Sequence, residues 1–295
     1  MVEHARQYDH WAWLYNATLG PRYGQSKIGP LARVILPDLP QGGAILDLCC
    51  GTGQLAAILT QRGFSVTGVD GSPDMLRHAR ENAPEAEFIE ADCRNFTVRS
   101  KYDGVICASA SLNHMRTAED LRGVFTSVNH ALKVGGPFVF DVNHPGQMAR
   151  HWRGSATEGE TLPEYAWSIT PHYDVATASG AFTVEIYQRA GAGSTLADLA
   201  DKLSQKGLLR RWRLSRLRRY AAIRPEWKLN AVTNSVWGHD IDFLTSLLGE
   251  CGFSADVRST TGGAVDDDHG VYLLCRKVEE LDQAIVGADR EGALS

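Results

Sequence analysis

Runs of hydrophobic residues alternate with amphipathic stretches along the first half of the chain. The apolar runs predict strands over residues 44–49, 64–69, 86–90, 103–108 and 137–142. Apolar residues at helical spacing predict helices between them, over 53–62, 73–82 and 117–132. Strands that are apolar on both faces and separated by helices form a parallel sheet that is covered on both sides. The pattern therefore predicts an α/β fold.

The N-terminal segment has a different character, because its hydrophobic residues are mostly aromatic. Residues 3–19 place these aromatic side chains at helical spacing and predict one amphipathic helix. Pro21 and Gly24 are expected to end it. A second, short helix is predicted over residues 28–35, before the first strand.

The pattern changes again after Pro145. Residues 165–190 contain two β-type runs around an Ala-Thr-Ala-Ser-Gly turn, which predicts an antiparallel hairpin. The α/β pattern then resumes with a helix over 240–251 and two strands over 253–258 and 270–277. We predict a single domain spanning 1–295, with an antiparallel β lid inserted over 146–236 and a flexible tail over 278–295.

Composition and charge exclude several classes of protein. With 43% hydrophobic and 22% charged residues, the 295-residue chain has the composition of a globular protein. A formal net charge of -5 gives no overall attraction to nucleic acids or anionic membranes. The first ten residues lack the layout of a signal peptide, and no apolar stretch approaches the length of a membrane span. We therefore expect a cytoplasmic protein, without a membrane or nucleic-acid partner, that is a monomer or homodimer.

The six cysteines form no CxxC pair, and most of them fall in predicted strands or at strand ends. We interpret them as reduced, buried thiols that pack as small hydrophobic side chains. No cluster of Asp, Glu and His has the spacing of a metal site, so no metal is expected.

A glycine-rich turn follows the first predicted strand and leads into a helix. Gly51, Thr52 and Gly53 form its centre, and residues 51–56 fit the pattern G-x-G-x-x-A. Glycines let the backbone approach a ligand closely, and the free N–H groups at the start of a helix favour a negative group. The turn indicates a nucleotide-type cofactor, but by itself it does not distinguish a dinucleotide from S-adenosylmethionine.

Three acids separate these two cofactors. Asp47, Asp70 and Asp92 lie at the ends of three successive predicted strands. Asp47 is expected to be buried, where it needs a partner such as an ammonium group. Asp70 can accept both hydroxyls of a ribose, and Asp92 can accept the amine of an adenine. An amino acid, a ribose and an adenine in this order describe S-adenosylmethionine better than a dinucleotide; capping or turn roles for Asp70 and Asp92 are the alternative.

These residues belong to a series of motifs that resembles a known family. The segments ILDLCCGTG, VTGVDGSPDML, EADCRNF, YDGVICASASLNHM and VNHALKVGGPFVFDVNHP closely resemble the successive motifs of class I S-adenosylmethionine-dependent methyltransferases. The resemblance covers most of the chain outside the insert. Within the class, the chain looks most similar to small-molecule enzymes such as aminosugar N,N-dimethyltransferases and glycine N-methyltransferases.

The resemblance implies a Rossmann-like fold: a seven-stranded mixed sheet whose last strand pair is antiparallel, with helices on both faces. It implies S-adenosyl-L-methionine as cofactor, held by Tyr8, Tyr15, Asp47, Cys49, Gly51, Thr52, Gly53, Asp70, Gly71, Ser72, Met75, Asp92, Cys93 and Ser109. For the two tyrosines, packing against the sheet is an equal alternative. Cys49 stands where the family commonly has glycine; we expect it to be tolerated because of a negative φ angle.

Methyl transfer requires a positioned nucleophile and, for some acceptors, a base. His114 and His144 follow the fourth and fifth predicted strands, and each is a candidate base or a hydrogen-bonding residue of its turn. Asn113 is a candidate for holding the substrate or its own turn. Trp167 and Trp237 of the insert are candidates for substrate binding, with packing in a small β core as the alternative.

The stretch 206–219 carries seven basic residues and is either an anion site or a solvated face. We predict methyl transfer from S-adenosylmethionine to nitrogen or oxygen of a small molecule. The alternatives are an RNA methyltransferase that uses the basic stretch, a nicotinamide-dependent oxidoreductase, and a non-catalytic binding protein of the same fold.

Overall fold

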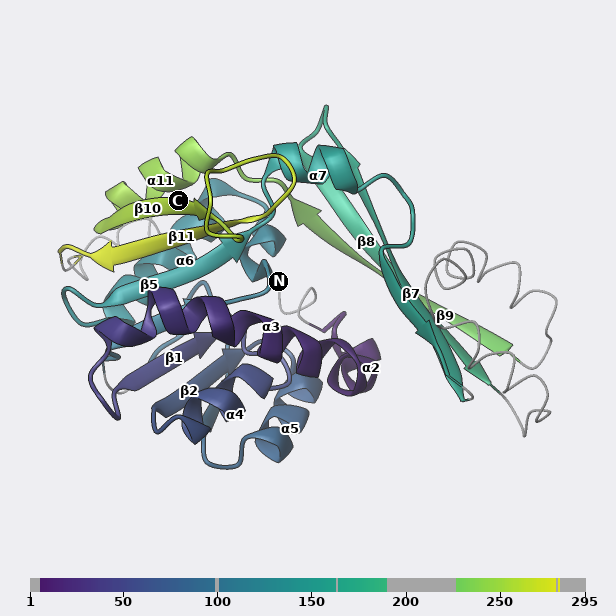
Figure 1. Ribbon diagram of the computed structural model, residues 1–295, viewed down its shortest axis with the longest axis horizontal. Helices are drawn as coiled ribbons and strands as arrows, with labels where there is room; N and C mark the ends of the chain where they lie inside the picture. Colours follow the sequence, from purple (N-terminus) through teal and green to yellow (C-terminus); the bar gives the residue numbers. More distant parts are fainter. Residues whose placement is uncertain (1–5, 99–100, 163, 190–226, 280, 282–295) are drawn as a thin grey trace, which may run out of the picture. The chain divides into compact units, whose positions relative to one another are not determined.

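A computed structural model describes residues 6–98, 101–162, 164–189, 227–279 and 281 (Figure 1). The chain divides into two compact units, one formed by residues 1–144 and 239–295 and the other by residues 145–238. The second unit has nearly the bounds of the predicted insert. The single-domain description and the role of the insert as a lid remain predictions.

The first unit is built on a seven-stranded sheet with the order β10-β11-β5-β4-β1-β2-β3. Its strands are β1 (Ala44–Leu48), β2 (Ser65–Asp70), β3 (Glu87–Glu90), β4 (Gly104–Cys107), β5 (Pro137–Val142), β10 (Phe253–Ser259) and β11 (Val271–Lys277). The first five strands are parallel, whereas β11 runs antiparallel to both β5 and β10. The predicted mixed sheet with an antiparallel last pair is confirmed.

Helices cover both faces of this sheet (Figure 1). One face packs against α3 (Leu19–Val34), α4 (Gln54–Gln61) and α5 (Pro73–Asn82), and the other packs against α6 (Ala118–Ala131) and α11 (Ile241–Glu250). The strand order reverses between β1 and β4, so the carboxyl ends of these two strands border the crevice where open α/β sheets bind ligands.

The N-terminal segment differs from the prediction. A short 3-10 helix, η1 (Asp9–Trp11), leads into α2 (Ala12–Ala17), and the long helix α3 follows after Thr18. Pro21 and Gly24, which were expected to end a helix, lie inside α3. Proline is tolerated there because the first turn of a helix has N–H groups without an intrahelical partner. The break comes at Thr18 instead, whose hydroxyl donates to the carbonyl of Leu14 at 2.6 Å.

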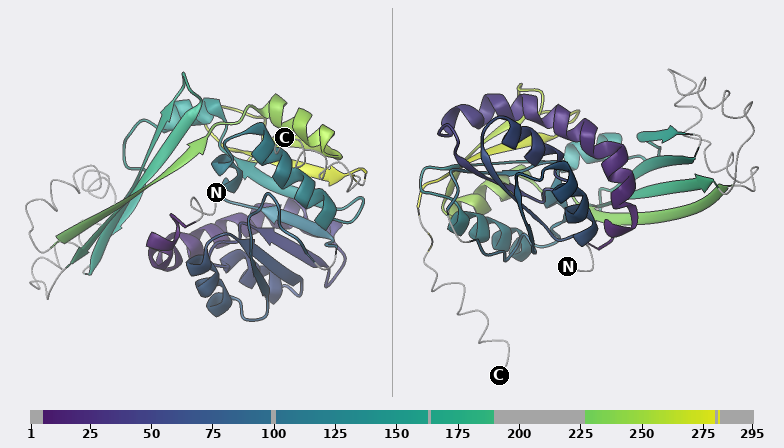
Figure 2. Two further views of the ribbon diagram at one scale, coloured as in Figure 1. Left: turned by 180° about the vertical axis from the view of Figure 1, so that it is seen from behind. Right: turned by 90° about the horizontal axis from the view of Figure 1, so that it is seen from below.

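The second unit contains a four-stranded antiparallel sheet with the order β6-β7-β8-β9 (Figure 2). The predicted hairpin is confirmed as β7 (Tyr165–Asp174) and β8 (Ser179–Arg189). The sequence pattern missed α7 (Pro145–His151) and the two outer strands β6 (Glu158–Thr161) and β9 (Trp227–Trp237). These strands were missed because short or polar runs lack the apolar signal of a buried strand.

The hairpin turn supplies a test of backbone strain. Ala178 has a φ of 48°, a left-handed conformation that costs a residue with a Cβ roughly 1–2 kcal/mol. Its side chain is exposed, so replacement by glycine loses no packing. We expect Ala178→Gly to raise the free energy of unfolding by about 1 kcal/mol. Ala176→Gly in the same turn, where φ is not positive, should lower it; equal effects of both variants in denaturant titrations would contradict this explanation.

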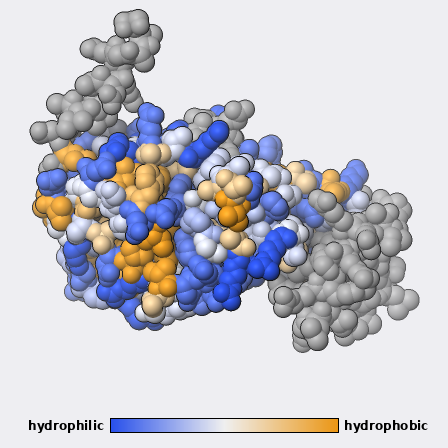
Figure 3. All heavy atoms as spheres, turned by 90° about the horizontal axis from the view of Figure 1, so that it is seen from above, coloured by the Kyte–Doolittle hydropathy of each residue, from blue (hydrophilic) through white to orange (hydrophobic). Residues whose placement is uncertain are grey.

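None of the helices in the described part of the chain has the length and hydrophobicity needed to cross a bilayer. On the face drawn in Figure 3, hydrophobic side chains form separate groups among hydrophilic ones. The basic stretch 206–219 lies outside the described residues, as does most of the predicted tail.

Candidate functional site

The glycine-rich turn joins β1 to α4 through backbone that only glycine adopts freely. Gly51 and Gly53 have φ angles of 55° and 75°, and Gly53 is the N-cap residue of α4. A Cβ on Gly53 would lie 2.9 Å from Cα and Cβ of Ala79 in α5. Both glycines allow the left-handed turn. Gly53 is also needed for the close packing of α4 against α5.

Cys49 corrects one expectation. Its φ is 57°, so it is not tolerated through a negative φ; it adopts the same left-handed conformation as its glycine neighbours. Its thiol interacts with the thiols of Cys107 and Cys93. The contact with Cys107 and burial raise the pKa of Cys49 well above its usual value, although the contact with Cys93 opposes this shift. The cost of the backbone conformation is offset by this packing. All six cysteines are free thiols, as expected.

Asp47 is a buried acid with an unpaired oxygen. The residue is 2% exposed, and its Oδ2 has no hydrogen-bond partner. Burial, and secondly the negative charge of Asp70, raise the pKa of Asp47 to about 7. A buried carboxylate in this state needs a cation or donor, and an ammonium group at the glycine-rich turn fits that need.

This raised pKa predicts how stability depends on pH. A proton binds Asp47 more tightly in the folded chain, with a pKa of about 7, than in the unfolded chain, with a pKa of about 3.9. The contribution of Asp47 to stability therefore decreases as the pH rises from about 4 to 7. In the ligand-free protein, Asp47→Asn should gain stability relative to the wild type between pH 4.5 and pH 8. Denaturant titrations at both pH values check this, and a constant difference would contradict it.

Asp70 closes β2 and holds the neighbouring loops. Its carboxylate accepts hydrogen bonds from the backbone N–H groups of Gly51 and Ser72, both at 2.9 Å. Burial raises the pKa of Asp70, although these N–H groups oppose the shift. Ser72 also caps α5, since its hydroxyl accepts from the N–H of Met75 at 3.1 Å. The acid therefore lies beside the glycine-rich turn, and contact with two ribose hydroxyls remains a prediction.

Asp92 has a partner that the sequence did not indicate. The guanidinium of Arg94 donates to its carboxylate, with Nη2 at 2.6 Å from Oδ2, and also binds Asp120. Burial alone would raise the pKa of Asp92, but the hydrogen bonds from Arg94 outweigh burial and lower it. Each carboxylate oxygen can accept more than one hydrogen bond, so contact with an adenine amine remains a prediction. The neighbouring Cys93 and also Met75 are buried.

The N-terminal aromatic residues extend over the glycine-rich turn. Tyr8 stacks on Trp11 at a centroid distance of 5.1 Å, and Trp11 packs edge to face with Tyr15 at 5.5 Å. A Cβ on Gly51 would lie 3.8 Å from Cε1 of Tyr15, so this ring borders the turn. The hydroxyl of Tyr8 lies 3.0 Å from Nε2 of His114. Tyr15 thus borders the glycine-rich turn and Tyr8 contacts His114, and closure of either ring over a cofactor remains a prediction.

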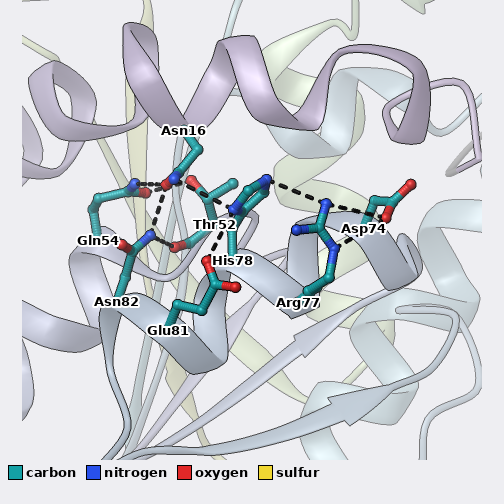
Figure 4. Close-up of polar contacts among 8 residues, drawn as sticks. All are labelled: Asn16, Thr52, Gln54, Asp74, Arg77, His78, Glu81 and Asn82. Atoms are coloured by element: carbon teal, nitrogen blue, oxygen red, sulfur yellow. Dashed lines mark hydrogen bonds and ion pairs between the residues drawn. The ribbon is translucent and has the colours of Figure 1, made fainter.

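A polar cluster fastens this segment to the turn (Figure 4). The side-chain oxygen of Asn16 in α2 accepts hydrogen bonds from Gln54 at 2.8 Å and from Asn82 at 2.7 Å. Asn82 also donates to the carbonyl of Thr52 at 2.7 Å. Asn16 therefore joins α2 to the beginning of α4 and the end of α5, a role that the sequence did not indicate.

A second fastening lies at the end of β5. The Nζ of Lys27 in α3 donates to Oδ2 of Asp141 at 2.8 Å, and the N–H of Ser109 donates to Oδ1 at 2.7 Å. Asp141 is only 6% exposed. Lys27 and Asp141 were not among the site residues predicted from the sequence. The available signal was an acid within an otherwise apolar strand, the same signal that identified Asp47.

The two candidate histidines have different surroundings. His114 ends the short helix η3 (Ser111–His114) and contacts Tyr8. His144 is buried, and its Nε2 lies 2.9 Å from the carbonyl oxygen of Asp266 and 3.2 Å from that of His269. His144 therefore fastens the loop before β11, and a role of either histidine as a base remains a prediction.

The predicted substrate residues are similarly engaged. The amide of Asn113 donates to the carbonyl of Asn143 at 2.8 Å and accepts from its N–H at 2.9 Å, which links the loops after β4 and β5. Trp167 pairs with Ile186 in the second unit, whereas Trp237 pairs with Ser179. Side chains alternate between the faces of a strand, so the two tryptophans lie on opposite faces of this sheet and do not line one surface together.

Among the described residues, no group of three or more His, Cys, Asp or Glu side chains is arranged to hold a metal ion.

Residues 45–136 match the family model described as a methyltransferase domain. A putative methyltransferase YqeM of Bacillus subtilis is 36% identical over 136 residues, which are 44% of this chain and 55% of the relative. The dTDP-3-amino-3,4,6-trideoxy-alpha-D-glucopyranose N,N-dimethyltransferase of Streptomyces venezuelae is 29% identical over 48% of this chain and 57% of that enzyme. The chain thus spans about half the length of these curated relatives.

The whole fold is also found in solved structures. A methyltransferase from Clostridium acetobutylicum, whose structure is described as S-adenosylmethionine-dependent, superposes with a TM-score of 0.66 at 17% identity. The match covers 91% of this chain and 98% of that one. The resemblance to class I methyltransferases that the sequence motifs indicate is confirmed, with the match to the family model placed on the half of the sheet that carries the glycine-rich turn.

Proposed function

We propose that this protein transfers the methyl group of S-adenosylmethionine to a nitrogen or oxygen atom of a small molecule. The observation that carries the proposal is the buried, unpaired Oδ2 of Asp47 beside the glycine-rich turn. Asp70 stands at the end of the adjacent strand, and Asp92 follows the strand after it. A nicotinamide dinucleotide has no ammonium group for Asp47, whereas the amino-acid part of S-adenosylmethionine has one.

The described residues fit this cofactor part by part. Asp47 would pair with the ammonium group, and Asp70 would accept the ribose hydroxyls. Asp92 and Cys93 would border the adenine edge, with Met75 beneath the ring. The loops after β1 and β2 would contribute backbone N–H groups and hydroxyls, from Gly51, Thr52, Gly53, Gly71 and Ser72. Ser109 would border the methionine part. The fit rests on the orphaned Asp47 oxygen and on the close backbone approach at the two glycines.

S-adenosylmethionine supplies an electrophilic methyl group on a sulfonium, so the protein must position the acceptor, exclude water and, for some acceptors, remove a proton. Tyr8 and Tyr15 exclude water from above the glycine-rich turn. Burial raises the pKa of Tyr8, which keeps its phenol protonated at neutral pH. A phenol hydroxyl can donate or accept; in the tautomer in which Nε2–H of His114 donates to the Tyr8 oxygen, the lone pair lies on Nδ1, where the ring can take up a proton. His114 is the base that we propose for an acceptor that must lose a proton, with His144 as the second candidate.

The acceptor is proposed to be a small amine or hydroxyl compound. The Streptomyces venezuelae relative is named for N,N-dimethylation of an aminosugar nucleotide, which supports nitrogen as the accepting atom. The second unit, with Trp167 on one face of its sheet and Trp237 on the other, is proposed to select the acceptor as a lid, together with Asn113. We further propose that the protein acts in the cytoplasm as a monomer or homodimer, without a nucleic-acid partner.

The test is calorimetric titration of the purified protein with S-adenosylhomocysteine and, in parallel, with NAD. We expect binding of the first ligand alone, which would justify a screen of amines and phenols for methylation. Binding of NAD without binding of S-adenosylhomocysteine would reject the proposal and favour an oxidoreductase. Binding of S-adenosylhomocysteine without methylation of any acceptor in the screen would favour a binding protein.

A further inference from the structure

A closed chain of contacts runs from Tyr8 through His114 and Asp141 back to the N-terminal segment. The hydroxyl of Tyr8 meets Nε2 of His114 at 3.0 Å, and His114 ends the helix η3. The residue before η3 is Ala110, and the preceding residue is Ser109, whose N–H donates to Asp141. Asp141 in turn binds Lys27 of α3, which belongs to the same N-terminal segment as Tyr8.

The turn inside this chain of contacts is held in an unfavourable conformation. Ser109 and Ala110 have φ angles of 67° and 56°, a left-handed conformation that residues with a Cβ rarely adopt twice in succession. Such backbone persists only where the surroundings hold it in place. The hydrogen bond from Ser109 to Asp141, at 2.7 Å, joins this backbone to β5, while the N–H of Asn113 donates to the carbonyl of Ala110 at 3.1 Å within the turn.

Asp141 is placed to serve two elements at once. One carboxylate oxygen binds the ammonium of Lys27 and the other binds the N–H of Ser109. The ammonium also lies 5.8 Å from the centre of the Tyr272 ring, which covers the pair from β11. A buried ion pair is a poor source of stability, because removal of both charges from water offsets their attraction. Stability alone therefore does not explain this ion pair, and its two contacts point to a positioning role.

We propose that Lys27 and Asp141 are positioning residues, which keep the N-terminal segment closed over the cofactor loops and set the location of His114. This inference rests on the proposed function, because closure has meaning only if a cofactor binds beneath Tyr8. The ion pair fixes α3, and with it the preceding segment that carries Tyr8 and Tyr15. Through Ser109 it also fixes the turn that leads to His114.

The experiment measures the binding and release of tritiated S-adenosylhomocysteine by wild type, Asp141→Asn, Lys27→Met and Lys27→Arg. We expect the release rate to rise about tenfold in Asp141→Asn and Lys27→Met, with the association rate changed less than about twofold. Lys27→Arg keeps the ion pair and should stay within about threefold of wild type. Lys133→Met is the matched control, because it removes an ion pair of 2.7 Å with Asp103 at another place in the unit.

A purely structural role gives a different result. A variant that is partly unfolded binds less ligand and associates more slowly, but the folded fraction releases ligand at the wild-type rate. If Asp141→Asn does not fold, the release rates of Lys27→Met and Lys27→Arg still distinguish a positioning role from a purely structural one. Wild-type release rates in Asp141→Asn and Lys27→Met would overturn the inference and leave the proposed function intact. Absence of binding by the wild type would overturn both.

Discussion

Replacement of Asp70 by alanine is expected to weaken the binding of S-adenosylhomocysteine by about 100-fold or more. The proposed ribose contacts are hydrogen bonds to a charged acceptor, each worth about 1.5–3 kcal/mol. The loss of two such bonds exceeds the roughly 2.7 kcal/mol that a 100-fold change in affinity represents. The same carboxylate orders the N–H groups of Gly51 and Ser72, so its removal also loosens the cofactor loops.

The matched control for this prediction is Asp74→Ala. Asp74 lies in the first turn of α5, four residues after Asp70, and its side chain is 46% exposed. Titration calorimetry should give wild-type affinity for this control. Unchanged affinity in Asp70→Ala, in a protein with the wild-type melting temperature, would show that Asp70 does not hold the ribose.

Gly53→Ala is expected to lower the free energy of unfolding by about 3 kcal/mol. The φ of 75° alone costs a residue with a Cβ about 1–2 kcal/mol. The added Cβ would also lie 2.9 Å from the Cα and Cβ of Ala79, and such overpacking typically costs about 1–3 kcal/mol. Because backbone of α5 is the obstacle, the glycine-rich turn must shift, and we expect S-adenosylhomocysteine binding to fall with stability.

Gly63→Ala separates the two contributions. Gly63 has a φ of 89°, and a Cβ there meets no atom within 4 Å. Denaturant titrations should therefore show a loss of only about 1–2 kcal/mol. If both variants lose the same amount, the contact between the turn and Ala79 is not what requires glycine at position 53.

The elements with strong periodicity were predicted well. The helix at 73–82 and the strand at 137–142 have the predicted bounds, and the other strands of the large sheet and the helices between them differ by one residue at one or both ends. The local spacing of apolar residues is sufficient to predict these helices and strands, because each of them buries one face or both against a continuous core. The second unit was predicted less completely, since its outer strands carry little apolar signal.

The candidate site also has residues that the sequence indicated and residues that it did not. Asp47 and Asp70 were found from the sequence because an acid at the end of an apolar strand is conspicuous. The contacts of Asn16, Lys27 and Asp141 were not found, because each joins elements that are far apart in the chain. The φ of Cys49 was also mispredicted, since the conformation of one turn residue depends on what packs around it.

By itself, the sequence determined the strands, the glycine-rich turn and the three acids at successive strand ends, because secondary structure and burial follow from local patterns of hydrophobicity. The tertiary structure alone decided which side chains meet near that edge: Arg94 with Asp120, Lys27 with Asp141, and Tyr8 with His114. Such pairs depend on the path of the whole chain through space. A hydrogen bond or an ion pair is specified by distance and direction between two atoms, which separation along the sequence does not encode.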